Sequence, residues 1–385
     1  MVNGAKKEYL RAIRIRYLEA SKKEKSIILD EFCINCKYNR KYAIRLIRAS
    51  AATGKSPGKH SGRRKKYHLP EIVDFLKELL RASNLICSKR LKAAIPMWLP
   101  HYSKSNLTDN VKCLLMQISS ATIDRLLSQF RKKYSKYGLA TTKPGSLIRK
   151  HIPIKTNQWN ESHPGFLEAD TVAHCGNSIS GSFVYTVNTV DIATGWTEQR
   201  AAWGKGQKGV FEALQSIESC LPFPIIGFDS DNGTEFLNYH LYSYFVNRKK
   251  PVQYTRSRAY HKNDNAHIEQ KNWTNIRQYL GYLRFDNPDI TSLLNELYTS
   301  EWRLFFNFFI PSVKLIDKLR IGSKVIKIHD APKTPFHRLL ESDSIKRSIK
   351  KQLQAQFVTL NPYALQKAVR EKVLNILKLA AGQAS

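Results

Sequence analysis

Acidic residues are scarce in this sequence. Its 385 residues include 31 Asp and Glu against 63 Lys and Arg, which gives a formal net charge of +32. Such a charge is far more than solubility requires and indicates a polyanionic partner, with nucleic acid favoured over a membrane surface. Long apolar runs are also missing, because the stretch FFNFFIP at 305–311 is far shorter than the roughly 20 residues of a membrane-spanning helix. We therefore expect no membrane partner.

Cysteine is sparse as well, with six residues scattered along the chain and no framework spacing. Cys33 and Cys36 have the separation of two zinc ligands, but a structural zinc site needs four ligands and no second such pair follows. Free thiols in a reducing compartment are the favoured interpretation. The first residues contain no apolar segment of the secretory type, so a cytoplasmic protein is expected.

The few acids are concentrated in the middle of the chain. Residues 161–290 carry 14 Asp and Glu against 12 Lys and Arg, whereas residues 1–160 carry 10 against 35 and residues 291–385 carry 7 against 16. Carboxylates next to bound nucleic acid would repel its phosphates unless a cation lay between them. The distribution favours basic arms that hold a polyanion and a centre that binds divalent metal, although a chance fluctuation of surface charge is the alternative.

Two helical groups are predicted in the basic first half. Residues 5–50 show three helical patterns, and the third, NRKYAIRLIRAS, buries Tyr42, Ala43, Leu46 and Ile47. Three short helices with a basic third one suggest a helix-turn-helix, whose last helix enters the major groove. An ordinary three-helix bundle with a solvated basic face is the alternative. The residues expected to contact DNA on this helix are Lys41, Arg45 and Arg48.

A basic linker joins this group to the second one. Its Arg63 and Arg64 are expected to follow phosphates without reading bases. The last helix of the second group, SSATIDRLLSQFRKKY, presents Arg125, Gln129 and Lys132 on its polar face. Two such units in tandem favour double-stranded DNA as the partner.

The acidic centre changes to short β-rich runs. The order of predicted elements is βββαβαβα, in which the second helix starts at Gly233, and it indicates a mixed sheet with helices on its faces. Asp170 falls on the first strand, with Glu168 two positions earlier, and Asp229 and Asp231 lie at the end of the fourth strand. Glu269 falls early in the last helix. A single acid in such a place is more often a cap or a surface residue, but acids at strand ends and on a packing helix can converge at one edge.

The segments EADTVAH, FDSDNGTEF and NDNAHIEQKN, in that order, resemble the three acidic signatures of the D-D-E superfamily of bacterial insertion-sequence transposases and retroviral integrases. The resemblance covers about 161–285 and implies an RNase H-like fold in which Asp170, Asp231 and Glu269 are catalytic metal ligands. Asp231 and Glu269 are separated by slightly more residues than is usual in the family. The His-His-Cys-Cys zinc module of the retroviral members is not visible.

The resemblance implies a DNA transposase that cleaves the ends of a mobile element and transfers the 3′-OH end into target DNA, with two Mg²⁺ or Mn²⁺ ions. It further implies a homo-oligomer assembled on DNA and a location at the bacterial nucleoid. Asn265, Lys271 and Arg277 are additional candidates for DNA contact, although a solvated helix face competes for the last two. Two other functions stay open: a DNA-binding regulator descended from a transposase, and an RNase H-like nuclease.

The expected fold class is α+β in several domains, with helix-turn-helix units first, an RNase H-like core, and a mainly helical C-terminal region. The predicted segments are 1–54 and 69–135 for the two DNA-binding units, 55–68 and 136–160 for the linkers, 161–290 for the catalytic core and 291–385 for the C-terminal region.

Overall fold

The structure is a computed structural model, and it describes residues 3–49, 66–104, 107–132, 161–231, 233–257 and 266–382. The chain forms two compact units, residues 1–65 and residues 66–385. Arg63, Arg64 and Asn265, which were predicted to contact DNA, lie outside the described residues.

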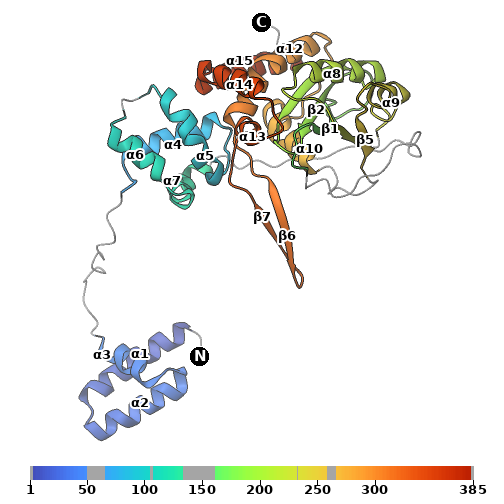
Figure 1. The fold of residues 1–385 in the computed structure, drawn as a ribbon. Helices are drawn as coiled ribbons and strands as arrows, with labels where there is room; N and C mark the ends of the chain where they lie inside the picture. Colours follow the sequence, from blue (N-terminus) through green and yellow to red (C-terminus); the bar gives the residue numbers. More distant parts are fainter. Residues whose placement is uncertain are drawn as a thin grey trace. The chain divides into compact units, whose positions relative to one another are not determined.

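The first unit contains the three predicted helices, α1 (Asn3–Glu19), α2 (Lys22–Cys36) and α3 (Arg40–Arg48) (Figure 1). Local hydrogen bonds fix where α2 and α3 begin. A capping box formed by Ser21 and Glu24 opens α2, and the side chain of Asn39 accepts a hydrogen bond from the backbone N–H of Lys41 at the start of α3.

The interior of this unit is apolar. Ile13 and Tyr17 from α1, Phe32 from α2, and Ala43 and Ile47 from α3 are all buried. The prediction that Tyr42 is buried was wrong: 39% of it is exposed, and the guanidinium of Arg45 lies over its ring at 5.1 Å. A phenol ring can remain at the surface when a cation covers its face.

The second helical group consists of α4 (Pro70–Ala82), α5 (Ser88–Trp98), the short 3₁₀ turn η1 (Leu99–His101), α6 (Asp109–Gln117) and α7 (Ser120–Lys132). It packs against the C-terminal region. The indole Nε1 of Trp98 donates to the carbonyl oxygen of Phe309 at 3.1 Å, and its ring meets the rings of Phe305 and Tyr363 edge to face. This group therefore shares one core with residues far along the chain.

A five-stranded mixed sheet forms the centre of the second unit. Its strands are β1 (Phe166–Ala173), β2 (Val184–Asp191), β3 (Thr197–Trp203), β4 (Gly227–Ser230) and β5 (Gln253–Arg256). The order in the sheet is β3-β2-β1-β4-β5, with the first three strands antiparallel and β4 parallel to both β1 and β5. The predicted mixed sheet is confirmed.

Helices cover this sheet, as expected from the order of elements. They are α8 (Gln207–Cys220), α9 (Tyr239–Val246) and α10 (Ala266–Lys271), which continues through the π-helical turn η3 (Asn272–Arg277) into α11 (Gln278–Leu280). The helix predicted to begin at Gly233 begins only at Tyr239, because the side chain of Asn238 caps α9 there by accepting from the N–H of Leu241 at 2.9 Å. Residues 233–238 form turns instead.

The outer edge of β3 is covered by two asparagine side chains. Asn295, on α12 (Asp289–Leu297), both donates to the carbonyl oxygen of Ala201 and accepts from its N–H, at 2.9 and 2.8 Å. Asn307, on the π-helical turn η5 (Phe305–Phe309), does the same at Thr197, at 2.8 and 2.9 Å. Each amide imitates a neighbouring strand, so these positions of the edge are not open to pairing with another chain.

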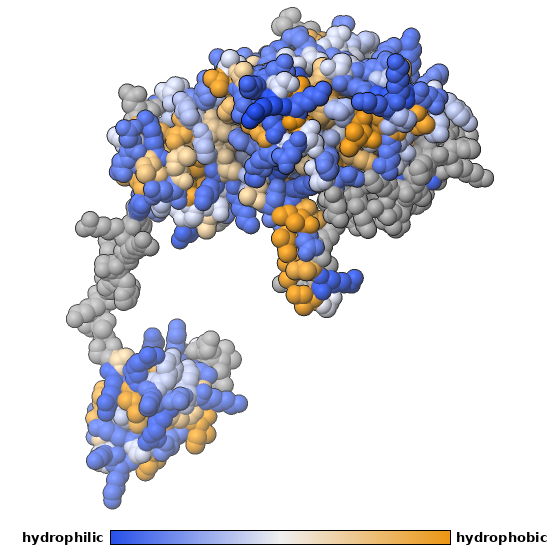
Figure 2. All heavy atoms as spheres, viewed as in Figure 1, coloured by the Kyte–Doolittle hydropathy of each residue, from blue (hydrophilic) through white to orange (hydrophobic). Residues whose placement is uncertain are grey.

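The C-terminal region is mainly helical, as predicted, and it also contains a hairpin that the sequence did not reveal. The remaining helices are η4 (Tyr298–Trp302), α13 (Pro335–Glu341), α14 (Arg347–Thr359) and α15 (Pro362–Ala380). Strands β6 (Leu315–Ile321) and β7 (Lys324–His329) form an extended antiparallel ribbon on which apolar side chains gather (Figure 1, Figure 2). No helix among the described residues is long and apolar enough to cross a membrane.

Replacing Asn307 by Leu is expected to destabilise the protein. The side chain is fully buried, so Leu would leave the N–H and carbonyl groups of Thr197 without partners. An unpaired buried polar group costs about 1–3 kcal/mol, and the free energy of unfolding should fall by about 2–5 kcal/mol. The exposed Asn247 is the control, because Asn247→Leu should change stability by less than about 0.5 kcal/mol. Equal effects in urea unfolding would show that the edge contact contributes little.

The stability of the protein should also depend on the protonation of His174. Its ring is fully buried, stacked on Phe285, with Nε2 at 2.9 Å from the hydroxyl of Thr186. Burial, and to a smaller extent the charge of Arg277, lowers the pKa of His174 to about 3. The ordinary value is about 6.5, so the unfolded chain binds a proton that the folded chain does not.

The contribution of neutral His174 is therefore complete above about pH 6.5 and is lost as the pH falls towards 3, at about 1.4 kcal/mol per pH unit. Between pH 6.5 and 5 the wild type should lose about 1.5 kcal/mol more stability than His174→Gln. Urea unfolding at both pH values measures the difference, and parallel curves would contradict a neutral buried imidazole.

Candidate functional site

Asp170, within β1, and Asp231, directly after β4, lie next to each other where the pairing of these two strands stops. β1 and β4 run parallel, and their last paired residues are Ala169 and Ser230. The next residue on each strand is an aspartate, and neighbouring strands lie about 4.8 Å apart. The fold thus brings together two carboxylates that are more than sixty positions apart in the sequence, at an edge where both are only half-buried.

The two carboxylates influence each other's protonation. Burial raises the pKa of Asp170 to about 8, with a further contribution from the charge of Asp231. Burial also raises the pKa of Asp231, followed by the charge of Glu235. Shifts that arise from desolvation together with a specific like charge are typical of sites that bind cations or move protons.

Several donors hold these carboxylates in place. Oδ1 of Asp170 accepts from the N–H of Thr171 at 2.7 Å, and its Oδ2 accepts from Nδ2 of Asn272 at 2.6 Å. Oδ1 of Asp231 accepts from the N–H of Gly233 at 2.9 Å. These bonds favour the charged carboxylates and oppose the effect of burial.

The helix that carries Glu269 is attached to β1 by the other acid of the first motif. Oε2 of Glu168, which is buried, accepts from the N–H of Ile268 at 3.0 Å at the start of α10. A carboxylate at a helix N-terminus is favoured by the helix dipole. Burial raises the pKa of Glu168 well above its usual range, and the charges of Asp229 and Glu269 contribute to the rise. Glu168 therefore positions the helix.

Glu269 itself is exposed, three residues before Asn272 on the same helix. Residues three apart share a helix face, and Asn272 bonds Asp170, so Glu269 lies on the side of the helix that meets β1. In the part of the chain that the structure describes, no three His, Cys, Asp or Glu side chains are grouped so that they could hold a metal ion. The assignment of Glu269 as a ligand remains a prediction.

Glu235 is the site residue that sequence reasoning missed. It is buried, and its Oε1 accepts from Nζ of Lys205 at 2.8 Å and from the hydroxyl of Thr171 at 3.1 Å. Its Oε2 has no hydrogen-bond partner among the described residues. Its place depends on the turn that replaces the predicted start of α9. The sequence held one related feature, Gly233. In the structure a Cβ at this position would lie 2.4 Å from Oε2 of Glu235, so only glycine leaves room for the carboxylate.

Asp229 has a different environment from Asp231. It lies within β4, is buried, and accepts a hydrogen bond from the hydroxyl of Thr255 on β5. A buried carboxylate that binds a neighbouring strand serves the packing of the sheet. Of the two aspartates in FDSDNG, only Asp231 reaches the half-buried edge.

The residues predicted to contact DNA fall into two groups. Those on the helical arms are accessible: Lys41, Arg45 and Arg48 are exposed on α3, and Arg125 and Gln129 are exposed on α7. Lys132 is the last residue of α7. The two on the helix after Glu269, Lys271 and Arg277, are engaged within the fold.

Arg277 donates to the carbonyl oxygen of Ala173 at 2.8 Å and lies over the ring of Tyr282, so it connects η3 to the end of β1. Lys271 lines a small pocket with Lys314 and Arg338. Burial, followed by the charges of Arg90 and Arg338, lowers the pKa of Lys271 to about 7. Neither side chain is positioned like those on α3 and α7.

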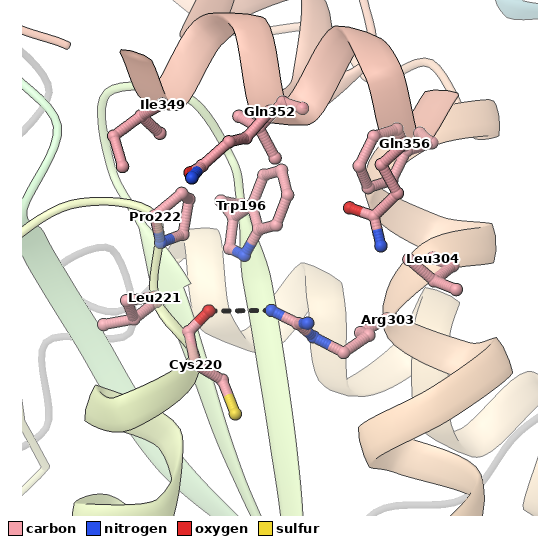
Figure 3. Close-up of a pocket in the computed structure, with 11 residues that line it drawn as sticks. Trp196, Cys220, Leu221, Pro222, Arg303, Leu304, Ile349, Gln352 and Gln356 are labelled. Atoms are coloured by element: carbon pink, nitrogen blue, oxygen red, sulfur yellow. Dashed lines mark hydrogen bonds between the residues drawn. The ribbon is translucent and has the colours of Figure 1, made fainter. Parts of the chain in front are cut away.

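A larger pocket of about 480 Å³ lies apart from the carboxylates (Figure 3). It is lined by the end of α8, by Arg303 and by one face of α14, where Gln352 and Gln356 point inward. Arg303 donates to the carbonyl oxygen of Cys220 at 2.8 Å and forms an ion pair with the buried Glu198. None of the candidate catalytic residues lines it.

Among solved structures, the chain is similar to the simian T-cell lymphotropic virus intasome in complex with PP2A regulatory subunit B56 gamma, with 12% identity and a TM-score of 0.31 over 58% of this chain and 67% of that one. It is also similar to the catalytic core domain of BIV integrase, with 13% identity and a TM-score of 0.28 over 46% of this chain and 95% of that one.

No family model matches the sequence. A curated relative, the uncharacterized protein y4rM of Sinorhizobium fredii (strain NBRC 101917 / NGR234), is 38% identical over 335 residues, which span 86% of this chain and 94% of the relative. The chain therefore belongs to the same protein family as y4rM.

Proposed function

We propose that this protein is a DNA transposase, which binds the ends of a mobile element, cleaves them and joins the freed 3′-OH to target DNA. The observation that carries the proposal is the adjacent placement of Asp170, within β1, and Asp231, directly after the parallel strand β4, in a chain of net charge +32. The positive charge favours binding to the phosphates of DNA. Two adjacent carboxylates in such a basic protein would repel those phosphates, which supports a role for the pair other than DNA affinity.

The chemistry of the two aspartates supports divalent cations as the cofactor in this proposal. Hard carboxylate oxygens are the ligands that Mg²⁺ prefers. Burial and a neighbouring negative charge raise the pKa of both aspartates, and a bound cation would neutralise these negative charges. Asp170, Asp231 and Glu269 would hold two Mg²⁺ or Mn²⁺ ions, which would activate the attacking oxygen and stabilise the leaving oxygen.

Other groups of the protein would hold the carboxylates in the required orientation. Asn272 and the N–H of Thr171 orient Asp170, Gly233 orients Asp231, and Glu168 holds α10 against β1. Water first attacks the phosphodiester at the element's end and releases a 3′-OH. That hydroxyl then attacks a target phosphodiester, so one bond forms as another breaks in each step.

The helical arms provide the affinity for DNA in this proposal. The exposed cations of α3 and α7 lie on units distant in sequence from the carboxylates, so binding and cleavage should be separable. Two helix-turn-helix units would read two subsites at each element end, and a homo-oligomer would bring two ends together.

Asp231→Asn should abolish strand cleavage and leave DNA affinity equal or slightly higher, because it removes a negative charge that faces the DNA backbone. The matched control is Asp229→Asn, two residues earlier and bonded to Thr255, which should still cleave. Gel assays with DNA from both flanks of the gene, in Mg²⁺, measure cleavage, and titration of the same DNA measures binding. Binding without cleavage by the wild type would favour a regulator, and parallel loss of both in Asp231→Asn would contradict the division of roles.

Arg45→Ala and Arg125→Ala should weaken binding only for particular base pairs, by about 1–3 kcal/mol at each affected position. Both side chains are exposed on helices that are held rigidly by their own cores. Replacing Arg63 and Arg64 by Ala should weaken binding to all sequences and flatten its salt dependence. Titrations against variant ends at several salt concentrations distinguish the cases, and a uniform loss from every substitution would reduce the helices to a nonspecific basic surface.

A further inference from the structure

Three amide side chains stand in one row across the sheet, next to Asp170. Asn188 on β2 is the register partner of Asp170 on β1, and Gln199 on β3 is the register partner of Asn188. Directly paired residues of antiparallel strands lie on the same face of a sheet. Asn188 and Gln199 are fully buried, and Asn272, on the helix above, completes the row.

The three amides are joined by hydrogen bonds that run in one direction. Nε2 of Gln199 donates to Oδ1 of Asn188 at 2.7 Å, and Nδ2 of Asn188 donates to Oδ1 of Asn272 at 2.7 Å. Nδ2 of Asn272 then donates to Oδ2 of Asp170 at 2.6 Å. The row therefore begins at the outer strand of the sheet and ends on the candidate catalytic carboxylate.

The direction of this row is fixed by chemistry. When Asp170 is ionised, either beside a bound cation or above its raised pKa, its carboxylate only accepts hydrogen bonds, so Asn272 has to present its NH₂ group to it. Its oxygen then faces Asn188, which has to present its own NH₂ group, and the same requirement passes to Gln199. Each amide can satisfy its neighbour in only one of its two orientations, so the orientation of one depends on the next.

We propose that Asn188 and Gln199 are positioning residues of the carboxylate site, which act by setting the orientation of Asn272 and through it the carboxylate of Asp170. The inference rests on the proposed function, because it assigns Asp170 to a site for divalent cations. Without Asn188, the amide of Asn272 can turn its oxygen towards Asp170, where two acceptors repel each other. Partners that orient a metal-binding carboxylate typically contribute 10–100-fold to metal affinity.

The test is a calorimetric titration of the full chain with Mn²⁺ alone. Asn188→Leu should weaken Mn²⁺ binding at least about tenfold. Gln199→Met keeps the side-chain shape nearly constant and removes only the donor to Asn188, which is one hydrogen bond further from Asp170, so it should weaken Mn²⁺ binding less. The matched control is Asn295→Leu, since Asn295 is also an amide that bonds β3, at Ala201, but has no connection to Asp170. Its Mn²⁺ affinity should stay within about twofold of the wild type. Equal affinities in the wild type and Asn188→Leu, or equal losses in Asn188→Leu and Asn295→Leu, would overturn the proposal.

A second measurement separates this inference from the proposed function. If the wild type binds no Mn²⁺, the proposed function is contradicted, and the amide row is judged without metal by NMR of asparagine side chains. The NH₂ protons of Asn272 should exchange slowly in the wild type and in Asn295→Leu, and quickly in Asn188→Leu. An unchanged Asn272 signal in Asn188→Leu would overturn the inference whether or not metal binds.

Discussion

The parallel pairing of β1 with β4 is the constraint on which the site depends. It places two like charges next to each other, Asp170 within β1 and Asp231 directly after β4, among residues that are mostly buried. Desolvation and repulsion both disfavour this arrangement in the absence of a cation, and the raised pKa of each carboxylate reflects that cost. The charge of Lys205 offsets part of this cost at Asp231.

The surroundings of the pair reduce this cost without removing it. Asn272, the N–H of Thr171 and the N–H of Gly233 donate to the two aspartates, and Lys205 lies against Glu235. The donors to the two aspartates are fixed by the backbone or by a packed helix, whereas Lys205 lies in the bend between β3 and α8. The site is thus pre-organised by elements on both sides of the sheet edge, which is what a catalytic constellation requires if binding energy is to be used for chemistry.

The sequence predicted how strands and helices follow one another along the chain, because alternating apolar runs and turn residues between 161 and 257 are local signals. It also placed Asp170 on the first strand and Asp231 at the end of the fourth, as the structure has them. The position of Glu235 could not be derived that way: a pattern that fits a helix from Gly233 was overridden by the capping of α9 at Asn238. Local propensity gave the wrong start, and the turn that resulted carries a buried acid into the site.

The amide row and the β6–β7 hairpin were missed for two different reasons. Asn188, Gln199 and Asn272 meet only when the register of three strands and the docking of a helix are known, and a change of register by one residue would turn Asn188 to the other face. The hairpin lies in a stretch whose apolar residues read equally well as part of the helical C-terminal core. Non-local pairing decided the amide row, whereas β6 and β7 pair locally across the turn at Gly322 and Ser323, so the hairpin did have a signal in the sequence.

The most direct test of the central claim is an anomalous diffraction map of crystals of the full chain bound to element-end DNA and soaked in Mn²⁺. The account predicts Mn²⁺ density in contact with both Asp170 and Asp231, with Glu269 among the ligands and the scissile phosphate beside it. Density that avoids Asp170 and Asp231, or none at all while DNA is bound, would contradict it.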